Sequence, residues 1–255
     1  MTQKTYHSWR RLALGAALAA AIGASPSAMA GNSSLTLDFD DLGPQFIGAG
    51  DDPLNHKGLQ LSAYSVDPDV QRGDLLAAIF DGNDASMCMG LSCPVNDGTP
   101  GYYAGLNGSA LVIGSSQPAG LHIKSFDASF IGGFPRQGYD QYYPDVAGLL
   151  EVRGFKADGS YVSERYQLTG TFGANFYMSH YDASAAFASQ SFTQIAIFAY
   201  SCNFAGNCMA FGDNSGQFAL DNLALDVSAV PEPSSWMMLL GGLGAVATIR
   251  RRRSA

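Results

Sequence analysis

Residues 147–168 read AGLLEVRGFKADGSYVSERYQL, two runs of strand-forming residues on either side of a turn. The turn contains Asp158 and Gly159, and an Asp-Gly pair is a strong signal for a tight hairpin connection. The stretch therefore predicts two antiparallel strands. Its two glutamates, Glu151 and Glu164, are expected at the surface of this hairpin, where charged groups are normally solvated.

Similar short runs, in which apolar and polar residues alternate, recur along the chain and predict further strands. They lie at residues 34–39, 58–64, 75–82, 110–116, 121–130, 192–201 and 216–227. In 121–130 the alternation places Leu121 and Ile123 on the same face as Ser125 and Asp127, so it weakens toward the end of the run. Residues 192–201 are apolar on both faces, which indicates a central strand.

The helical signal is weak, because only residues 181–190, which are rich in alanine, predict a short helix. Many short strands with turn residues between them are typical of a sandwich. The fold class that we predict is all-β, with a single β-sandwich domain of jelly-roll-like type over residues 31–229. The long segment 81–107 is rich in glycine, asparagine and aspartate, and it is expected to form an ordered loop.

The four cysteines fall into two local pairs, Cys88 with Cys93 and Cys202 with Cys208. Each pair closes a small loop, and we predict a disulfide in each if the chain is exported. A zinc site is the alternative, but the spacings do not match zinc knuckles and no histidine lies near either pair.

The first 30 residues have the pattern of a secretory signal peptide. A basic start is followed by an apolar run of about 13 residues and by a small-residue site, Ala28-Met29-Ala30, so cleavage is expected before Gly31. An uncleaved membrane anchor is the alternative, although the run is short for one. Residues 31–229 then hold seven basic and 21 acidic residues, a net charge of −14. Such a polyanionic domain is not expected to bind nucleic acid.

The last 26 residues, from Val230 to Ala255, combine three features. They begin with Pro231-Glu232-Pro233, an extended strip that cannot be helical. An apolar segment follows at 234–249, which as a helix is about 24 Å long. The segment ends in four arginines, Arg250, Arg251, Arg252 and Arg253. The basic cluster predicts that the domain lies outside the cytoplasmic membrane.

This arrangement resembles the PEP-CTERM sorting signal of Gram-negative bacteria. The resemblance implies export by the Sec machinery, a transient inner-membrane anchor at residues 230–255, and recognition by exosortase, which removes the tail. It also implies a final place at the cell surface, outer membrane or extracellular matrix. Just upstream, Gln217, Phe218 and Asp221 form a Q-F-x-x-D arrangement similar to that of the QFxxD-type group of PEP-CTERM proteins.

Candidate binding residues fall into two sets. Asp38, Asp40 and Asp221 lie near the first and last strands and offer the hard oxygen ligands of a structural calcium ion; turn capping is the other interpretation of these aspartates. Tyr139, Tyr142 and Tyr143 lie in a tyrosine-rich stretch that could contact a glycan, although exposed tyrosines also occur without any ligand.

No catalytic residue is predicted, because no known nucleophile, metalloprotease or phosphate-binding motif occurs. We therefore expect a non-enzymatic surface or matrix protein with a structural or adhesive role linked to exopolysaccharide or biofilm. A calcium-dependent carbohydrate-binding module is the alternative, and a secreted hydrolase is a third possibility.

Overall fold

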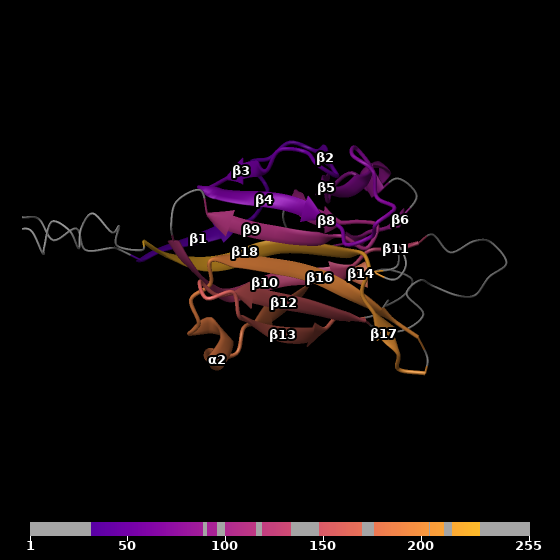
Figure 1. The fold of residues 1–255 in the computed structure, drawn as a ribbon. Coiled ribbons are helices and arrows are strands. Elements are labelled where there is room, and N and C mark those ends of the chain that lie inside the picture. The colour runs from indigo at the N-terminus through magenta and orange to yellow at the C-terminus, as the bar shows by residue number, and fades with distance from the viewer. Residues whose placement is uncertain are drawn as a thin grey trace, which may run out of the picture. The chain divides into compact units, whose positions relative to one another are not determined.

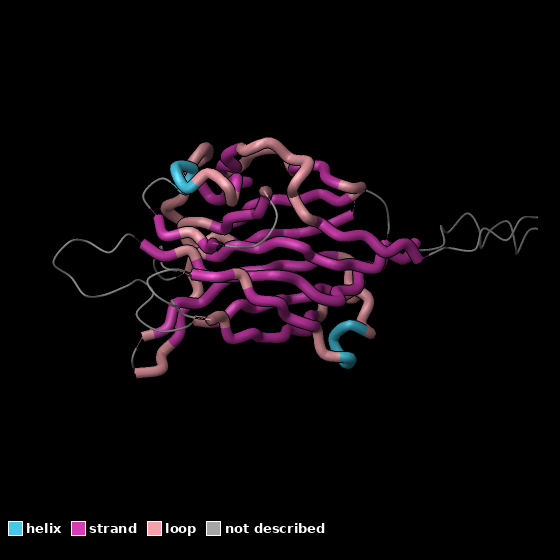
Figure 2. The backbone as a smooth tube through the Cα atoms, turned by 180° about the vertical axis from the view of Figure 1, so that it is seen from behind, coloured by secondary structure: helices cyan, strands magenta, loops and turns pink. Residues whose placement is uncertain are grey.

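The computed structural model describes residues 32–88, 91–95, 100–115, 119–133, 148–169, 176–203, 205–211 and 216–229. Within them strands are the main secondary structure, and the two short helical turns lie at opposite ends of the strands (Figure 2). These turns are η1 (Ala85–Cys88) and α2 (Ala185–Ala188).

Two antiparallel sheets dominate the described residues (Figure 1). In the first sheet the order is β15 (Ser179–Asp182), β10 (Ala119–Phe130), β18 (Phe218–Ala229), β8 (Gly101–Gly105), β5 (Leu75–Asp81) and β2 (Gln45–Gly48). A further strand, β1 (Asn32–Leu37), pairs with β18 beyond the end of β8.

In the second sheet the order is β13 (Tyr161–Gln167), β12 (Leu149–Phe155), β16 (Gln194–Cys202), β9 (Ala110–Ser115), β4 (Leu59–Tyr64) and β3 (Leu54–His56). The short β17 (Cys208–Met209) pairs with the end of β16. Two small pairs complete the described strands. Strand β6 (Leu91–Ser92) pairs with β11 (Gly132–Gly133) in antiparallel orientation, and β7 (Pro94–Val95) pairs with β14 (Phe176–Tyr177) in parallel orientation.

The two sheets pack face to face over one hydrophobic core. Leu37 in β1, Phe126 in β10 and Leu220 in β18 supply it from the first sheet, and Leu61 in β4 and Ile197 in β16 supply it from the second. All five are at most 1% exposed. This arrangement confirms the all-β sandwich, and it places β16 in the interior of its sheet as its apolar composition predicted.

A second, smaller cluster covers the outer face of the first sheet. Phe80 of β5 and Tyr102 of β8 are buried there, and Met87 of η1 packs against them. The expectation of a loop over residues 81–107 is therefore wrong at its end. Residues 101–105 form β8, an interior strand of the first sheet that is buried along its whole length. Its glycines and tyrosines carry no alternating pattern, because both faces of the strand are covered.

The loss of alternation in residues 121–130 has a structural cause. The pairing of β10 with β18 shifts register between Ile123 and Ser125 and again between Ser125 and Asp127. These irregularities reverse the alternation, so Phe126, not Ser125, continues the core face after Ile123. The polar residues Ser125 and Asp127 therefore lie on the outward face of one continuous strand.

The predicted helix at 181–190 is shorter than expected. Its first two residues belong to β15, and α2 occupies only Ala185–Ala188. Ser184 caps this turn, since its side chain accepts a hydrogen bond from the Phe187 backbone N–H at 3.2 Å. Phe187 then packs into the core, which fixes the turn against the sandwich.

Candidate functional site

A groove of about 660 Å³ lies on the outer face of the second sheet. Alternation along β16 creates it: Ile195 and Ile197 face the core, whereas Ala196 and Phe198 face outward. The neighbouring β9 contributes only the small Ala110 and Val112 to the lining. The full lining comprises Tyr64, Val66, Ala110, Val112, Arg153, Phe155, Gln194, Ala196, Phe198, Tyr200, Cys208, Met209, Ala210 and Phe211.

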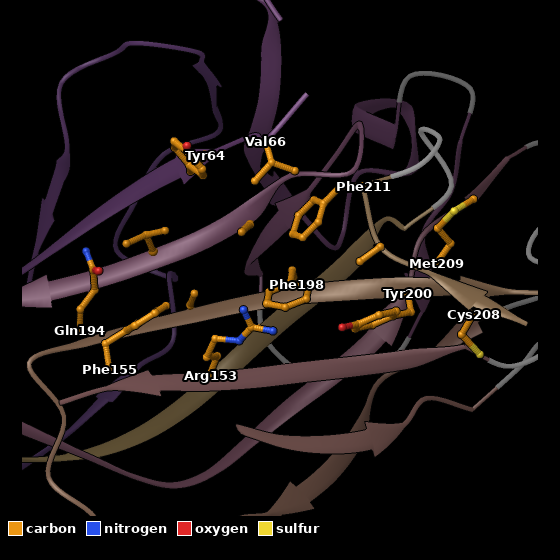
Figure 3. A pocket seen from close by; sticks show the side chains of 14 residues that line it. Tyr64, Val66, Arg153, Phe155, Gln194, Phe198, Tyr200, Cys208, Met209 and Phe211 are labelled. Atoms are coloured by element: carbon orange, nitrogen blue, oxygen red, sulfur yellow. The ribbon is translucent and has the colours of Figure 1, made fainter. Parts of the chain in front are cut away.

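Aromatic rings gather along this groove. Figure 3 shows Phe198 in its middle, with Tyr64 on one side and Arg153 on the other. The ring centroid of Phe198 lies 4.9 Å from that of Phe211 and 5.6 Å from that of Tyr200. Tyr64 is 58% exposed, so its ring is accessible to a ligand. The rings offer flat apolar faces beside polar tips, the combination that small-molecule and sugar sites use.

A buried carboxylate, Glu151, organises one wall of the groove. Arg153 donates to its Oε1 from Nη2 at 2.6 Å and from Nε at 3.0 Å. Arg165 Nε donates to Oε2 at 2.8 Å, and the Tyr200 hydroxyl donates to the same oxygen at 2.9 Å. The expectation that Glu151 lies at the surface is therefore wrong, since its side chain is fully buried beneath these three partners.

The hydrogen bonds determine the charge of Glu151. Burial alone would raise the pKa of this carboxyl, but the donors on Arg165, Arg153 and Tyr200 outweigh burial and lower the pKa below its ordinary value. The carboxylate is therefore ionised at neutral pH. With two guanidinium groups around one carboxylate, the network keeps one positive charge in excess at the groove.

The position of Arg153 is fixed by aromatic rings as well as by Glu151. Its guanidinium carbon lies 4.6 Å from the ring centroid of Tyr161 and 5.2 Å from that of Phe198. Among the described residues its Nη1 makes no hydrogen bond, while Nε and Nη2 are used by Glu151. The side chain is 29% exposed. A fixed, partly exposed guanidinium with a donor to spare can bind a ligand oxygen.

Both predicted disulfides are present, Cys88–Cys93 and Cys202–Cys208. Cys202 and Cys208 are also register partners between β16 and β17. This bond therefore holds β17 and the following residues beside the groove, where Met209, Ala210 and Phe211 form part of the lining.

Replacing Cys202 and Cys208 together by serine is expected to lower the free energy of unfolding by about 2 kcal/mol, because the short closed loop gains freedom in the unfolded chain. Amide hydrogen exchange at Met209–Phe211 is expected to accelerate, and mass spectrometry after exchange measures it. Serine replacement of Cys88 and Cys93 is the matched control. We expect it to lower the free energy of unfolding by a similar amount and to leave amide exchange at residues 209–211 unchanged. Unchanged exchange in the first variant would contradict the positioning role.

Of the predicted site residues that the structure describes, Cys208 lines the groove and the others lie elsewhere. Gln217, Phe218 and Asp221 are buried in or next to β18, at 7%, 0% and 0% exposure. Ten predicted residues lie outside the described residues: Tyr139, Tyr142, Tyr143, Pro231, Glu232, Pro233, Arg250, Arg251, Arg252 and Arg253.

Sequence reasoning missed the groove. The sequence carries one signal of it, the apolar outer face of residues 192–201, but the same pattern is expected of any central strand. The other contributors come from β4 and the residues just after it, from β9 and β12, and from β17 and the residues that follow it. Their convergence depends on the strand order.

The three aspartates proposed for calcium have separate environments. Asp38 accepts a hydrogen bond from Lys57 Nζ at 2.7 Å, Asp40 accepts one from the Gly101 backbone N–H at 3.0 Å, and Asp221 is buried in β18. Among the described residues, one group of three potential ligands has its atoms within 4.8 Å of one another: Asp38, Asp41 and His56. The structure thus groups Asp38 with residues other than Asp40 and Asp221.

Residues 229–253 match the PEP-CTERM protein-sorting motif. This match confirms the resemblance seen in the tail, and it marks the chain for export to the cell envelope or surface and for processing by exosortase. The QFxxD assignment stays a prediction. No helix in the described ranges is both long and apolar enough to cross a membrane.

No curated protein matches the sequence. Among solved structures the chain is similar to a DUF4465 family protein from Bacteroides ovatus, with 9% identity and a TM-score of 0.44 over 76% of this chain and 99% of that one. The enzymatically active domain of bacteriophage CBA120 tailspike protein 4 gives 12% identity and a TM-score of 0.29, with 67% and 19% of the two chains covered. Family 16 Carbohydrate Binding Module-2 is 14% identical with a TM-score of 0.26, and the match covers 58% of this chain and 84% of that one. At these TM-scores the similarities say nothing about function.

Proposed function

Because the tail carries a sorting motif for the cell surface, we propose that the sandwich is a non-catalytic, adhesive domain that holds exopolysaccharide in the groove of the second sheet. The observation that carries the proposal is the placement of Arg153 between the rings of Tyr161 and Phe198 on one side of the groove, with the exposed ring of Tyr64 on the other side. The biofilm role predicted from the sequence would follow from such binding.

The chemistry of the groove suits a sugar chain. One face of a pyranose ring presents C–H groups that can pack on an aromatic ring, while its hydroxyls need hydrogen-bond partners at the edges. Tyr64 and Phe211 supply rings, and Arg153 and Gln194 supply donors around them. The excess positive charge of the network around Glu151 favours a polysaccharide that bears carboxylate groups.

The net charge of the domain opposes acidic polymers at long range, but the opposition is weak at physiological salt. There the Debye length is about 8 Å, so distant surface carboxylates are largely screened. Arg153 lines the groove itself and can contact a bound polymer directly, and charge-assisted hydrogen bonds are stronger than neutral ones. Local chemistry is therefore expected to decide which polymer binds.

The same geometry supports a binding role over hydrolysis. Glycosidases place two carboxyl groups about 5–10 Å apart across the bond that they cleave. No aspartate or glutamate is among the described residues that line the groove. Glu151, the acidic group behind the wall, is held by two arginines and a tyrosine hydroxyl, so it has no proton to donate at neutral pH.

Replacing Tyr64 by alanine is expected to weaken polysaccharide binding about tenfold, because one stacking ring contributes on the order of 1–1.5 kcal/mol. Isothermal titration calorimetry of the full-length chain measures this, with polygalacturonate as the acidic probe and dextran as the neutral one. Phe46→Ala is the matched control, since Phe46 is 56% exposed but belongs to β2 of the first sheet.

The proposal predicts that wild type and Phe46→Ala bind polygalacturonate equally and that dextran binds more weakly. It is contradicted if Tyr64→Ala and Phe46→Ala have the same affinity, or if neither polymer nor the exopolysaccharide of the host binds wild type. Release of reducing sugars during the titration would contradict the non-catalytic assignment instead.

A further inference from the structure

Three potential metal ligands meet at an edge of the sandwich, away from the groove. Asp38 and Asp41 lie in the segment that follows β1, and His56 is the last residue of β3. One ligand atom from each lies within 4.8 Å of the other two. Strands β1 and β3 belong to different sheets, so the fold brings these residues together.

His56 is the unusual member of this cluster. The residue is 4% exposed, and its ring stacks on Phe39 with 6.0 Å between centroids and an interplanar angle of 22°. Within the part of the chain that the structure describes, its buried Nε2 has no hydrogen-bond partner, and Oδ1 of Asp41 lies 3.5 Å away. A buried polar atom without a partner costs about 1–3 kcal/mol, and native structures usually provide a partner.

The spacing fits a small divalent cation. Zinc binds histidine nitrogen and carboxylate oxygen at about 2.0–2.2 Å in tetrahedral geometry, which puts neighbouring ligand atoms about 3.4 Å apart. The 3.5 Å between His56 Nε2 and Asp41 Oδ1 is close to that value. We propose that Asp38, Asp41 and His56 form a binding site for a divalent transition metal of the zinc class. The imidazole ligand separates this site from calcium sites, which use oxygen ligands alone.

Lys57 is the competitor of the metal in this site. Its ammonium group donates to Asp38 Oδ1 at 2.7 Å and to the Thr36 backbone carbonyl at 2.9 Å. A bound cation must share or displace this contact, because both are positive charges at one carboxylate. Binding therefore needs only a local rearrangement of Asp38, while His56 and Asp41 are already at ligand spacing.

A metal held here would join the two sheets. Asp38 and Asp41 extend from the strand that pairs with β18, and His56 belongs to the edge strand of the opposite sheet. A ligand that binds only the folded chain stabilises it in proportion to the logarithm of its concentration over its Kd. The melting temperature of the full-length chain is therefore expected to rise with added zinc.

The test is calorimetric titration of the full-length chain, stripped of metal, with zinc sulfate alone. We expect one zinc per chain. His56→Gln is expected to weaken binding at least 30-fold, and Asp41→Asn at least tenfold. Lys57→Met is expected to tighten binding at least threefold, a direction that misfolding cannot produce. His180→Gln is the matched control, because His180 lies beside Asp127 and Asp182 at 2.7 and 3.5 Å on another part of the surface.

Equal affinity in wild type, His56→Gln and Lys57→Met would overturn the assignment, and so would loss of binding in His180→Gln with retention in His56→Gln. Calcium binding at the same residues, tighter than zinc, would overturn the metal class. Cobalt gives an independent measurement: its visible absorption in a four-coordinate site is expected in wild type and in His180→Gln, and its presence in His56→Gln would contradict the proposal.

Discussion

Replacing Phe218 by alanine is expected to lower the free energy of unfolding by about 3–5 kcal/mol, the range for removing a large aromatic side chain from a packed core. Phe218 is fully buried in β18, and its ring lies 6.1 Å from that of Tyr103. It also fills the space above Gly105, where an added Cβ would come within 2.3 Å of the ring. No neighbouring side chain at Gly105 can collapse into the cavity.

Urea denaturation at neutral pH measures this effect. Phe46→Ala is the control for loss of an aromatic ring, and because Phe46 is exposed we expect a change within about 0.5 kcal/mol. A loss below 1 kcal/mol for Phe218→Ala would contradict the packing role. If tail processing were then also impaired, the Gln217, Phe218 and Asp221 arrangement would act as a recognition element, and not as the core of a strand.

Replacing Glu151 by glutamine is expected to cost about 2–3 kcal/mol at neutral pH. The change leaves Arg153 and Arg165 without their common carboxylate, and hydrogen bonds to charged groups contribute about 1.5–3 kcal/mol. Removing one partner of a fully buried pair costs more, about 3–5 kcal/mol. That higher range is reduced here because the two arginine side chains are 29% and 57% exposed and can be solvated.

The effect should depend on pH in a defined direction. The pKa of Glu151 in the folded chain is below its ordinary value of 4.5. The carboxylate therefore contributes stability that is fully present above pH 4.5 and is lost as the pH falls through the folded pKa. Denaturation midpoints of wild type and Glu151→Gln should converge as the pH is lowered from 7 to 3.

Glu164→Gln is the matched control, since it removes the same charge from the adjacent strand. Among the described residues, its carboxylate accepts from the Ser184 backbone N–H at 3.2 and 3.3 Å and lies near the Tyr166 hydroxyl. A glutamine oxygen can accept the same bonds. We expect a loss below about 1 kcal/mol. A gap between wild type and Glu151→Gln that is constant from pH 7 to 3 would contradict the role assigned to ionised Glu151.

Alternation predicted the strands that have one face on the core and the other in solvent. Residues 58–64 are an example, since Leu59 and Leu61 are buried and Gln60 is partly exposed in β4. The hairpin also formed as predicted, with Gly159 in the turn at a φ of +83°. Where both faces are covered, as in β8, alternation disappears and the strand could not be recognised.

The groove could not be predicted for a different reason. Its lining comes from segments between Tyr64 and Phe211 that are far apart in sequence. The strand order places β4, β9, β16 and β12 side by side, and this order depends on long-range pairing that local patterns do not encode. Glu151 illustrates the limit: its burial depends on Tyr200, which is 49 positions away in the sequence.

Both boundaries of the sandwich lie at the same place. Asn32, where β1 begins, is the register partner of Ser228 near the end of β18, and Figure 1 shows the two strand ends side by side. Any tension applied through the chain after Ala229 would enter along β18, which is bonded to β10 on one side and to β8 and β1 on the other. The pull would load these ladders in shear, so many hydrogen bonds would have to break together. If the groove binds a polymer as proposed, a load between that polymer and the chain after Ala229 would thus be shared among several strand pairs.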